Sequence, residues 1–81
     1  MKGKATSNLK KYPSQTFKPL RLRALRHLRG LKQRQLAQLI WQKQPLISAL
    51  ENGRLRPDIE LHHMLAHALG CEPDKFLGDE E

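Results

Sequence analysis

The chain has 81 residues, a formal net charge of +7 and a single cysteine, Cys71. This length allows one small domain with a modest core, and one cysteine excludes an intrachain disulfide, so we expect a buried thiol. No apolar run reaches membrane-spanning length, and the first residues lack the apolar segment of a signal peptide. We therefore expect a cytoplasmic protein without contact to a membrane.

The charges are distributed unevenly along the chain. Residues 1–19 carry five lysines and no acid, residues 20–57 carry nine lysines or arginines against one glutamate, and residues 58–81 carry seven acids against one lysine. A basic front with an acidic rear favours a protein that presents one face to a polyanion, whereas a generally soluble basic protein is the simpler alternative.

Residues 1–17 lack helical periodicity and are predicted to form a flexible basic arm, whose lysines either contact phosphates or stay solvated. The folded domain is expected over residues 18–78, followed by an acidic tail at 79–81. Its first helix begins near Pro19 and ends before Gly30. Four more helices and no strands are expected, at about 33–40, 44–51, 58–69 and 73–77.

The second and third of these helices are short and closely spaced. Pro45 lies in the first turn of the third helix, and Asn52-Gly53 supplies the left-handed stop after it. Helices this short are marginal in water, so they must cross and pack, and Ala37 permits a close approach. Small polar side chains on such a helix, in a basic protein, suit a reader of the DNA major groove.

The stretch GLKQRQLAQLIWQKQPLISALENG resembles the helix-turn-helix of the Cro- and phage-repressor-like family of transcriptional regulators. The family pattern is roughly G-L-T-Q-x-x-L-A-x-x-L-G-V-S-x-x-x-I-S-x-x-E-N-G. It is matched without a gap at Gly30, Leu31, Gln33, Leu36, Ala37, Ile47, Ser48, Glu51, Asn52 and Gly53. The likeness covers Leu20 to Leu77 and implies an all-α, five-helix, lambda-repressor-like DNA-binding domain.

The resemblance also implies roles for individual residues. Gln44 matches a base-reading position, and a glutamine can bond N6 and N7 of adenine together. Leu46 would rest against a thymine methyl, with weaker base contacts from Ser48 and Ala49. Phosphate contacts are expected from Gln33, Lys43, Asn52, Arg54 and Arg56. A structural ion pair is expected between Arg26 and Glu51. For the DNA contacts, the alternative is a solvated surface residue.

Four residues of the helix pair depart from the family pattern. Lys32 and Lys43 stand where Thr or Ser usually cap the two helices. Trp41 replaces the turn glycine and Gln42 replaces a buried valine. Because a bulky residue with positive φ is costly, we expect a remodelled turn in which Trp41 swings inward and Gln42 outward.

The helix at 58–69 carries two apolar stripes and three histidines. Inward positions are expected for Ile59, Leu65, Ala66 and Leu69, while His62 replaces a leucine of the family pattern. The second stripe, formed by Leu61, Met64 and Ala68, is either a dimer contact or ordinary partial burial. His63 and His67 lie four apart, but two ligands make a poor metal site, so we expect no metal and no cofactor.

No nucleophile–base pair, phosphate loop or carboxylate pair at catalytic spacing occurs, so we expect a protein that is not an enzyme. The sequence and the resemblance predict a nucleoid-associated repressor that binds a two-fold operator on double-stranded DNA as a homodimer. One alternative is a HigA- or HipB-like antitoxin that also sequesters a toxin protein. Another is a protein-interaction adaptor that has lost DNA binding.

Overall fold

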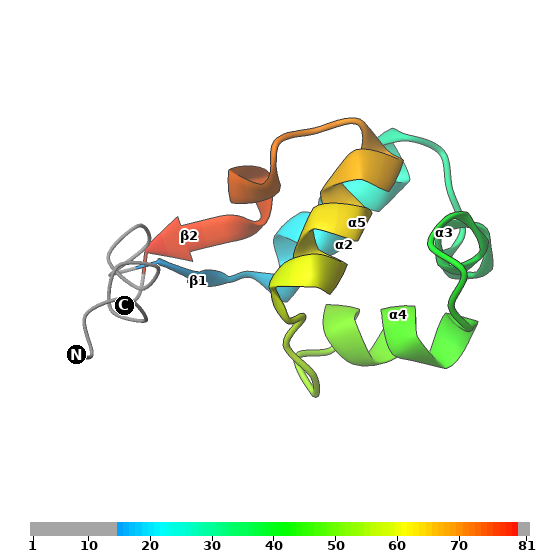
Figure 1. Cartoon of the computed structure of the whole chain (residues 1–81), viewed down its shortest axis with the longest axis horizontal. Coiled ribbons are helices and arrows are strands. Elements are labelled where there is room, and N and C mark those ends of the chain that lie inside the picture. The colour runs from blue at the N-terminus through cyan, green and yellow to red at the C-terminus, as the bar shows by residue number, and fades with distance from the viewer. Residues whose placement is uncertain (1–14, 80–81) are drawn as a thin grey trace.

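A computed structural model describes residues 15–79 of the chain. Within that range lie four α-helices, one 3₁₀ turn and one two-stranded antiparallel sheet (Figure 1). In chain order the elements are β1 (Gln15–Phe17), α2 (Pro19–Leu28), α3 (Gln33–Leu39), α4 (Gln44–Glu51), α5 (Ile59–Leu69), η1 (Pro73–Phe76) and β2 (Leu77–Asp79). The first four predicted helices are confirmed, and the fifth is the 3₁₀ turn η1. The expected absence of strands is wrong.

Helix ends follow the local chemistry of the sequence. The Oδ1 atom of Asp58 accepts a hydrogen bond from the first turn of α5 at 2.9 Å, which caps this helix. Lys32 and Lys43 precede α3 and α4 without a side-chain cap, since an ammonium group has no acceptor. The Lys32 N–H instead donates to Oε1 of Gln35 at 2.8 Å. The chain leaves α4 through Gly53, whose φ of +76° suits glycine.

The hydrophobic core brings residues from α2, α3, α4, α5 and η1 together. Its largest fully buried side chains are Phe76, Leu22, Leu36, Ile47, Leu50, Leu65 and Leu69. The prediction that Ile59 faces inward is wrong, because this residue is 70 % exposed. At 3.6 residues per turn, Ile59 lies about 120° round the helix from Leu65, and the half-buried Leu61 takes the inward position instead.

The strands β1 and β2 pair with Gln15 opposite Asp79 and Phe17 opposite Leu77. They lie side by side at one end of the molecule in Figure 1. Phe17 is 9 % exposed, and its ring lies 6.1 Å from that of Phe76 between centroids. Because burial of this aromatic ring draws the chain onto the core, residues 15–17 belong to the fold and not to a flexible arm. Residues 1–14 and 80–81 lie outside the described range.

His62 stands where the family pattern has leucine. Its ring packs against Phe17 and Phe76 at one end of the core. Its ring centroid lies 5.4 Å from Phe76 and 6.1 Å from Phe17. Its Nε2 atom lies 2.7 Å from the backbone oxygen of Pro73, within hydrogen-bonding distance. The imidazole therefore fills apolar space on one side and gives its polar atom a partner on η1.

Two arginines of α2 and the residue that follows it, Arg29, attach this helix to three other parts of the fold. Arg21 donates to the backbone oxygen of Leu77 on β2. The Nε atom of Arg29 donates to the backbone oxygen of Leu69, at the end of α5, at 2.7 Å. Arg26 reaches the end of α4. The charged face of α2 is therefore partly structural, because these guanidinium groups satisfy carbonyl and carboxylate oxygens elsewhere in the chain.

The turn between α3 and α4 has a left-handed residue, Trp41, where the family pattern has glycine. Trp41 has φ of +61° and is 90 % exposed, so the prediction that it swings inward is wrong. Ile40, at 2 % exposed, already fills the inward position. The turn is closed by the Gln42 N–H, which donates to the oxygen of Ala37 at 2.9 Å. The Gln42 side chain lies outward, as predicted.

We expect the Trp41→Gly variant to be more stable than Trp41→Ala, with a free energy of unfolding about 1 kcal/mol higher. Both variants lose an indole that is 90 % exposed, but only glycine relieves the left-handed backbone of its Cβ. Urea unfolding followed by far-ultraviolet circular dichroism measures this difference. A Trp41→Ala variant as stable as Trp41→Gly would show that the turn carries no such strain.

Candidate nucleic-acid interface

The helices α3 and α4 cross steeply, and α3 is seen nearly end-on while α4 lies across the view in Figure 1. Ala37 is 1 % exposed at the contact, and its small side chain permits this close approach. The inner side of α4 is anchored by Ile47 and Leu50, which are both fully buried. The first residue of α4, Gln44, is exposed. A short helix is thus fixed by its inner face while its N-terminal end stays accessible.

A buried ion pair joins α2 to the last residue of α4. The Nε and Nη2 atoms of Arg26 donate to the two carboxylate oxygens of Glu51 at 2.6 and 3.0 Å. The side chains are 8 % and 2 % exposed, and the Nη1 atom of Arg26 also donates to the backbone oxygen of Leu31 at 2.7 Å. This bidentate geometry fixes both the distance and the orientation between the two helices.

Two opposing effects set the pKa of Glu51. Burial raises it, but hydrogen bonds from Arg26 and Gln33 together with the charge of Arg26 outweigh burial, and the net pKa lies below its ordinary value. The carboxylate therefore stays ionised at neutral pH. Among residues 15–79, no buried side-chain nitrogen or oxygen lacks a hydrogen-bond partner, so this polar cluster is fully satisfied.

The ion pair extends through two amides to the exposed end of α4. Nε2 of Gln33 donates to Oε1 of Glu51 at 3.1 Å, and Nε2 of Gln44 donates to Oε1 of Gln33 at 2.7 Å. The resemblance places Gln33 against phosphate, whereas in the structure its side chain supports Gln44. No sequence pattern predicted this link, because it depends on how α3 and α4 cross. Gln44 retains its own carbonyl oxygen and a second N–H for a ligand.

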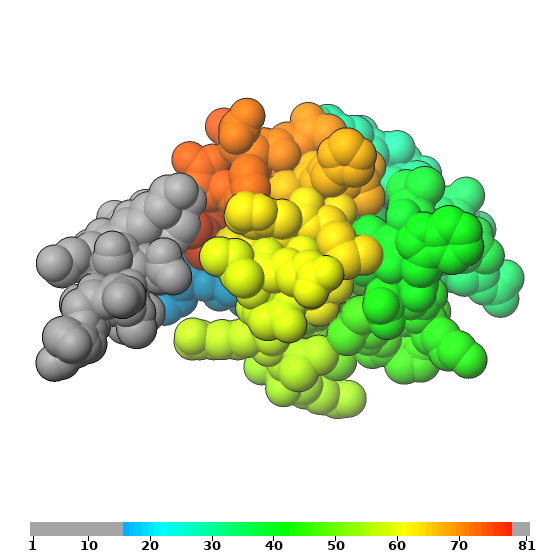
Figure 2. Space-filling model, viewed as in Figure 1, coloured from blue at the N-terminus to red at the C-terminus, as the bar shows by residue number. Residues whose placement is uncertain are grey.

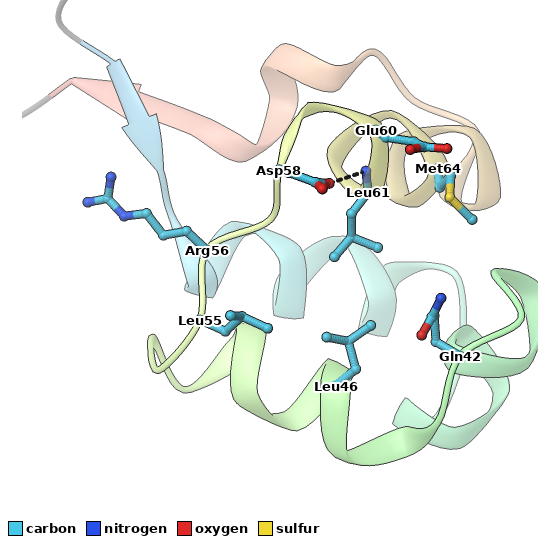
Figure 3. A pocket seen from close by; sticks show the side chains of 8 residues that line it. All are labelled: Gln42, Leu46, Leu55, Arg56, Asp58, Glu60, Leu61 and Met64. Atoms are coloured by element: carbon cyan, nitrogen blue, oxygen red, sulfur yellow. Dashed lines mark hydrogen bonds between the residues drawn. The ribbon is translucent and has the colours of Figure 1, made fainter.

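The other predicted contact residues differ in exposure. Asn52, Lys43, Arg54 and Arg56 are exposed, and Nδ2 of Asn52 donates to Oγ of Ser48 at 3.3 Å. Ser48 and Ala49 are half-buried. Leu46 is half-buried, packs against the core and points toward Leu61 of α5 in Figure 3.

The two flanks of α4 differ in chemistry. The flank toward α3 borders a polar groove lined by Arg26, Lys32, Gln33, Arg34, Gln35, Gln38 and Gln44. The flank toward α5 borders a more apolar groove. The Arg26–Glu51 pair is the one ion pair within the described part of the chain, so the exposed cations beside α4 have no carboxylate partner there. Unpaired cations beside an exposed helix end favour binding of a polyanion.

We also searched residues 15–79 for a metal site, a membrane-spanning helix and a reactive thiol. No group of three or more His, Cys, Asp and Glu side chains in this range could hold a metal ion. None of the helices described is long and apolar enough to cross a membrane. The Cys71 thiol is half-buried rather than enclosed in the core, and burial raises its pKa.

This arrangement of crossed helices defines a helix-turn-helix DNA-binding domain. The helix-turn-helix family pattern matches residues 22–76, and the chain belongs to this family, in its Cro-like branch. A protein named as an uncharacterized HTH-type transcriptional regulator of Methanothermobacter thermautotrophicus is 43 % identical over 54 residues, which cover 64 % of this chain and 78 % of that protein.

A solved structure shares the fold. The restriction-modification controller protein C.AhdI of Aeromonas hydrophila superposes with a TM-score of 0.69 at 33 % sequence identity, over 72 % of this chain and 88 % of that one. These matches confirm the lambda-repressor-like fold predicted from the sequence and a DNA-binding regulator as the class of protein.

We expect Glu51→Gln to lower the free energy of unfolding by about 3 kcal/mol at pH 7, because Arg26 would lose its buried counter-charge. The folded-state pKa of Glu51 is lowered, so its stabilisation is present above the unfolded-state value near 4.5 and is lost as the pH falls through the lower folded-state value. Urea unfolding of both proteins between pH 7 and pH 2.5 should show the difference shrinking below about pH 4.5. A constant difference throughout would contradict the assignment.

Proposed function

We propose that this protein is a sequence-specific repressor that binds a two-fold related DNA operator as a homodimer. The observation that carries the proposal is the hydrogen bond that holds the Gln44 amide against Gln33 at the exposed start of α4. Such a preset amide has little rotamer freedom left to lose on binding DNA. The family membership and the unpaired cations beside α4 support the same conclusion.

In the proposed complex the N-terminal end of α4 enters the major groove. The free carbonyl oxygen and N–H of Gln44 match N6 and N7 of adenine, which a glutamine reads together. Ser48 and Ala49 lie further along the helix and are proposed to make weaker contacts. We propose no base contact for Leu46, because its side chain lies in the groove on the α5 side of α4.

Phosphate contacts would fix the register of the domain on DNA without selecting the sequence. We assign them to Lys43 before α4 and to Asn52 and Arg54 after it, all of which are exposed. Gln33 would add its second amide N–H. Cations on both ends of one short helix match the two phosphate strands that border a major groove.

The two-fold operator follows from the size of the reading surface. One short helix end contacts a few base pairs, so two protomers in successive major grooves, about 34–36 Å apart, would be needed for a specific site. Occupancy of such an operator near a promoter would repress transcription. This role places the protein on the nucleoid in the cytoplasm.

Gln44→Ala should reduce discrimination between the selected operator and unrelated duplex DNA by about 1–3 kcal/mol, because the bidentate contact to one base is lost. The operator is first obtained by selecting bound sequences from random duplexes, and affinities are then measured by fluorescence anisotropy. Gln38→Ala, which removes an exposed amide from α3, is the matched control and should retain discrimination. Selection of no sequence at all would refute specific binding.

Arg54→Ala should weaken binding to operator and unrelated DNA by a similar factor, because a phosphate contact carries no sequence information. The slope of log affinity against log salt concentration should fall by about one unit per protomer. Lys75→Ala, which removes an exposed cation from η1, should leave the slope unchanged. A loss confined to the operator would show instead that Arg54 reads a base.

A further inference from the structure

Trp41 is costly to the fold in two ways. Its backbone has φ of +61°, a left-handed conformation in which a Cβ is strained, and its indole is 90 % exposed to water. The nearby Leu39 is 54 % exposed as well. Neither side chain adds to the core, because Ile40 already fills the interior at this point. Strain and apolar exposure that bring no gain in packing are typical of residues that serve a binding site.

The indole lines a hollow between the end of α3 and α5, which we name the Trp41 hollow. Leu39 and Ile40 line it on the α3 side. On the α5 side its lining follows one face of the helix over about two turns and consists of Glu60, His63, Met64, His67 and Ala68. Figure 2 shows α5 (yellow to orange) directly beside the segment of α3 and the turn (green) on the viewed face. An exposed aromatic ring thus stands beside an apolar surface that carries a few polar groups, as in many ligand sites.

The charge of the Trp41 hollow distinguishes it from other hollows of this basic protein. Four other surface hollows among residues 15–79 each include a lysine or an arginine in their lining. Neither residue type is among the described residues that line the Trp41 hollow, whereas the carboxylate of Glu60 is. This exposed carboxylate forms no ion pair within residues 15–79. An unpaired carboxylate beside an indole favours a cationic ligand and disfavours phosphate.

We propose that the Trp41 hollow binds a small, flat aromatic cation. The planar ring of the ligand stacks on the indole of Trp41, and its positive charge pairs with Glu60. The thioether of Met64 packs against the edge of the ring. His63 and His67 can each accept a hydrogen bond from the ligand when their imidazoles are neutral.

The dimensions of the hollow fit a small molecule better than a protein partner. Two helical turns span about 11 Å, which accommodates two or three fused rings. A stable protein interface needs about 800 Å² on each partner, more than one helix face and a turn residue provide. The site includes neither Gln44 nor the polar groove beside α4, so it goes beyond the proposed function and does not depend on it.

The first test titrates the full chain, freed of nucleic acid, with N-methylquinolinium, which has two fused rings and a fixed positive charge. Trp41 is the single tryptophan of the chain, so its fluorescence reports directly on the hollow. We expect saturable quenching with a dissociation constant below about 1 mM. Naphthoate, a similar ring system with a negative charge, should bind about tenfold more weakly or worse. Equal affinity for the two probes, or quenching that never saturates, would overturn the proposal.

The second test compares variants by isothermal titration calorimetry with N-methylquinolinium at slightly alkaline pH, where histidine is neutral. Glu60→Gln should weaken binding about tenfold, because it removes the charge and keeps the shape, and Trp41→Gly should weaken it at least as much. Glu72→Gln and Leu28→Ala are the matched controls at exposed residues outside the hollow, and they should bind as the parent does. Circular dichroism melts verify that all four variants are folded. Unchanged affinity in Glu60→Gln or in Trp41→Gly would refute the site.

Sedimentation equilibrium of the same samples distinguishes a ligand site from a contact between proteins. Saturating N-methylquinolinium should leave the association state of the chain unchanged. Dissociation of a complex by this cation, or by Trp41→Gly, would show that the hollow is covered by protein and would overturn the proposal. The repressor proposal is tested separately, through Gln44→Ala and Arg54→Ala, so either conclusion can fail without the other.

Discussion

The buried contact between Arg26 and Glu51 is the constraint on which the rest of the fold depends. Removing these two charges from water is costly. The bidentate geometry, a further acceptor for Arg26 in the Leu31 backbone oxygen and a further donor for Glu51 in Gln33 compensate that cost. The pair fixes the C-terminal end of α4 against α2, while Ile47 and Leu50 hold its inner face. An eight-residue helix has little stability of its own, so these tertiary contacts determine its direction.

The same carboxylate determines how Gln44 is presented. Glu51 accepts from Gln33, and Gln33 accepts from Gln44, so one buried charge orients two successive amides. A single amide hydrogen bond contributes little net free energy in water. A series of hydrogen bonds that starts at a buried ion is less able to rearrange, because each amide is oriented by the one before it. The proposed base contact therefore depends on a residue at the opposite end of the same helix, far from any base.

Local patterns gave the helix ends and the register of the helix pair, because caps, prolines and apolar spacing act within one turn. The pairing of β1 with β2 joins residues about sixty positions apart and leaves no such local signal. The exposed position of Trp41 could not be predicted from local strain, because it follows from the packing of Ile40, which already fills the interior. The Gln33–Gln44 bond needs both helices in place, so residue types alone suggested two separate DNA contacts.

Leu46 shows how a short helix divides its sides between different neighbours. The eight-residue helix α4 has a buried inner face and an exposed N-terminal end. Its two flanks border different neighbours. On the α3 side the neighbours are amides and cations, which suit phosphate. On the α5 side Leu46 meets Leu55 and Leu61, which do not. Leu46, which the family resemblance assigned to a thymine, therefore packs α4 against α5, and this contact helps to fix the direction of the helix whose exposed end carries Gln44.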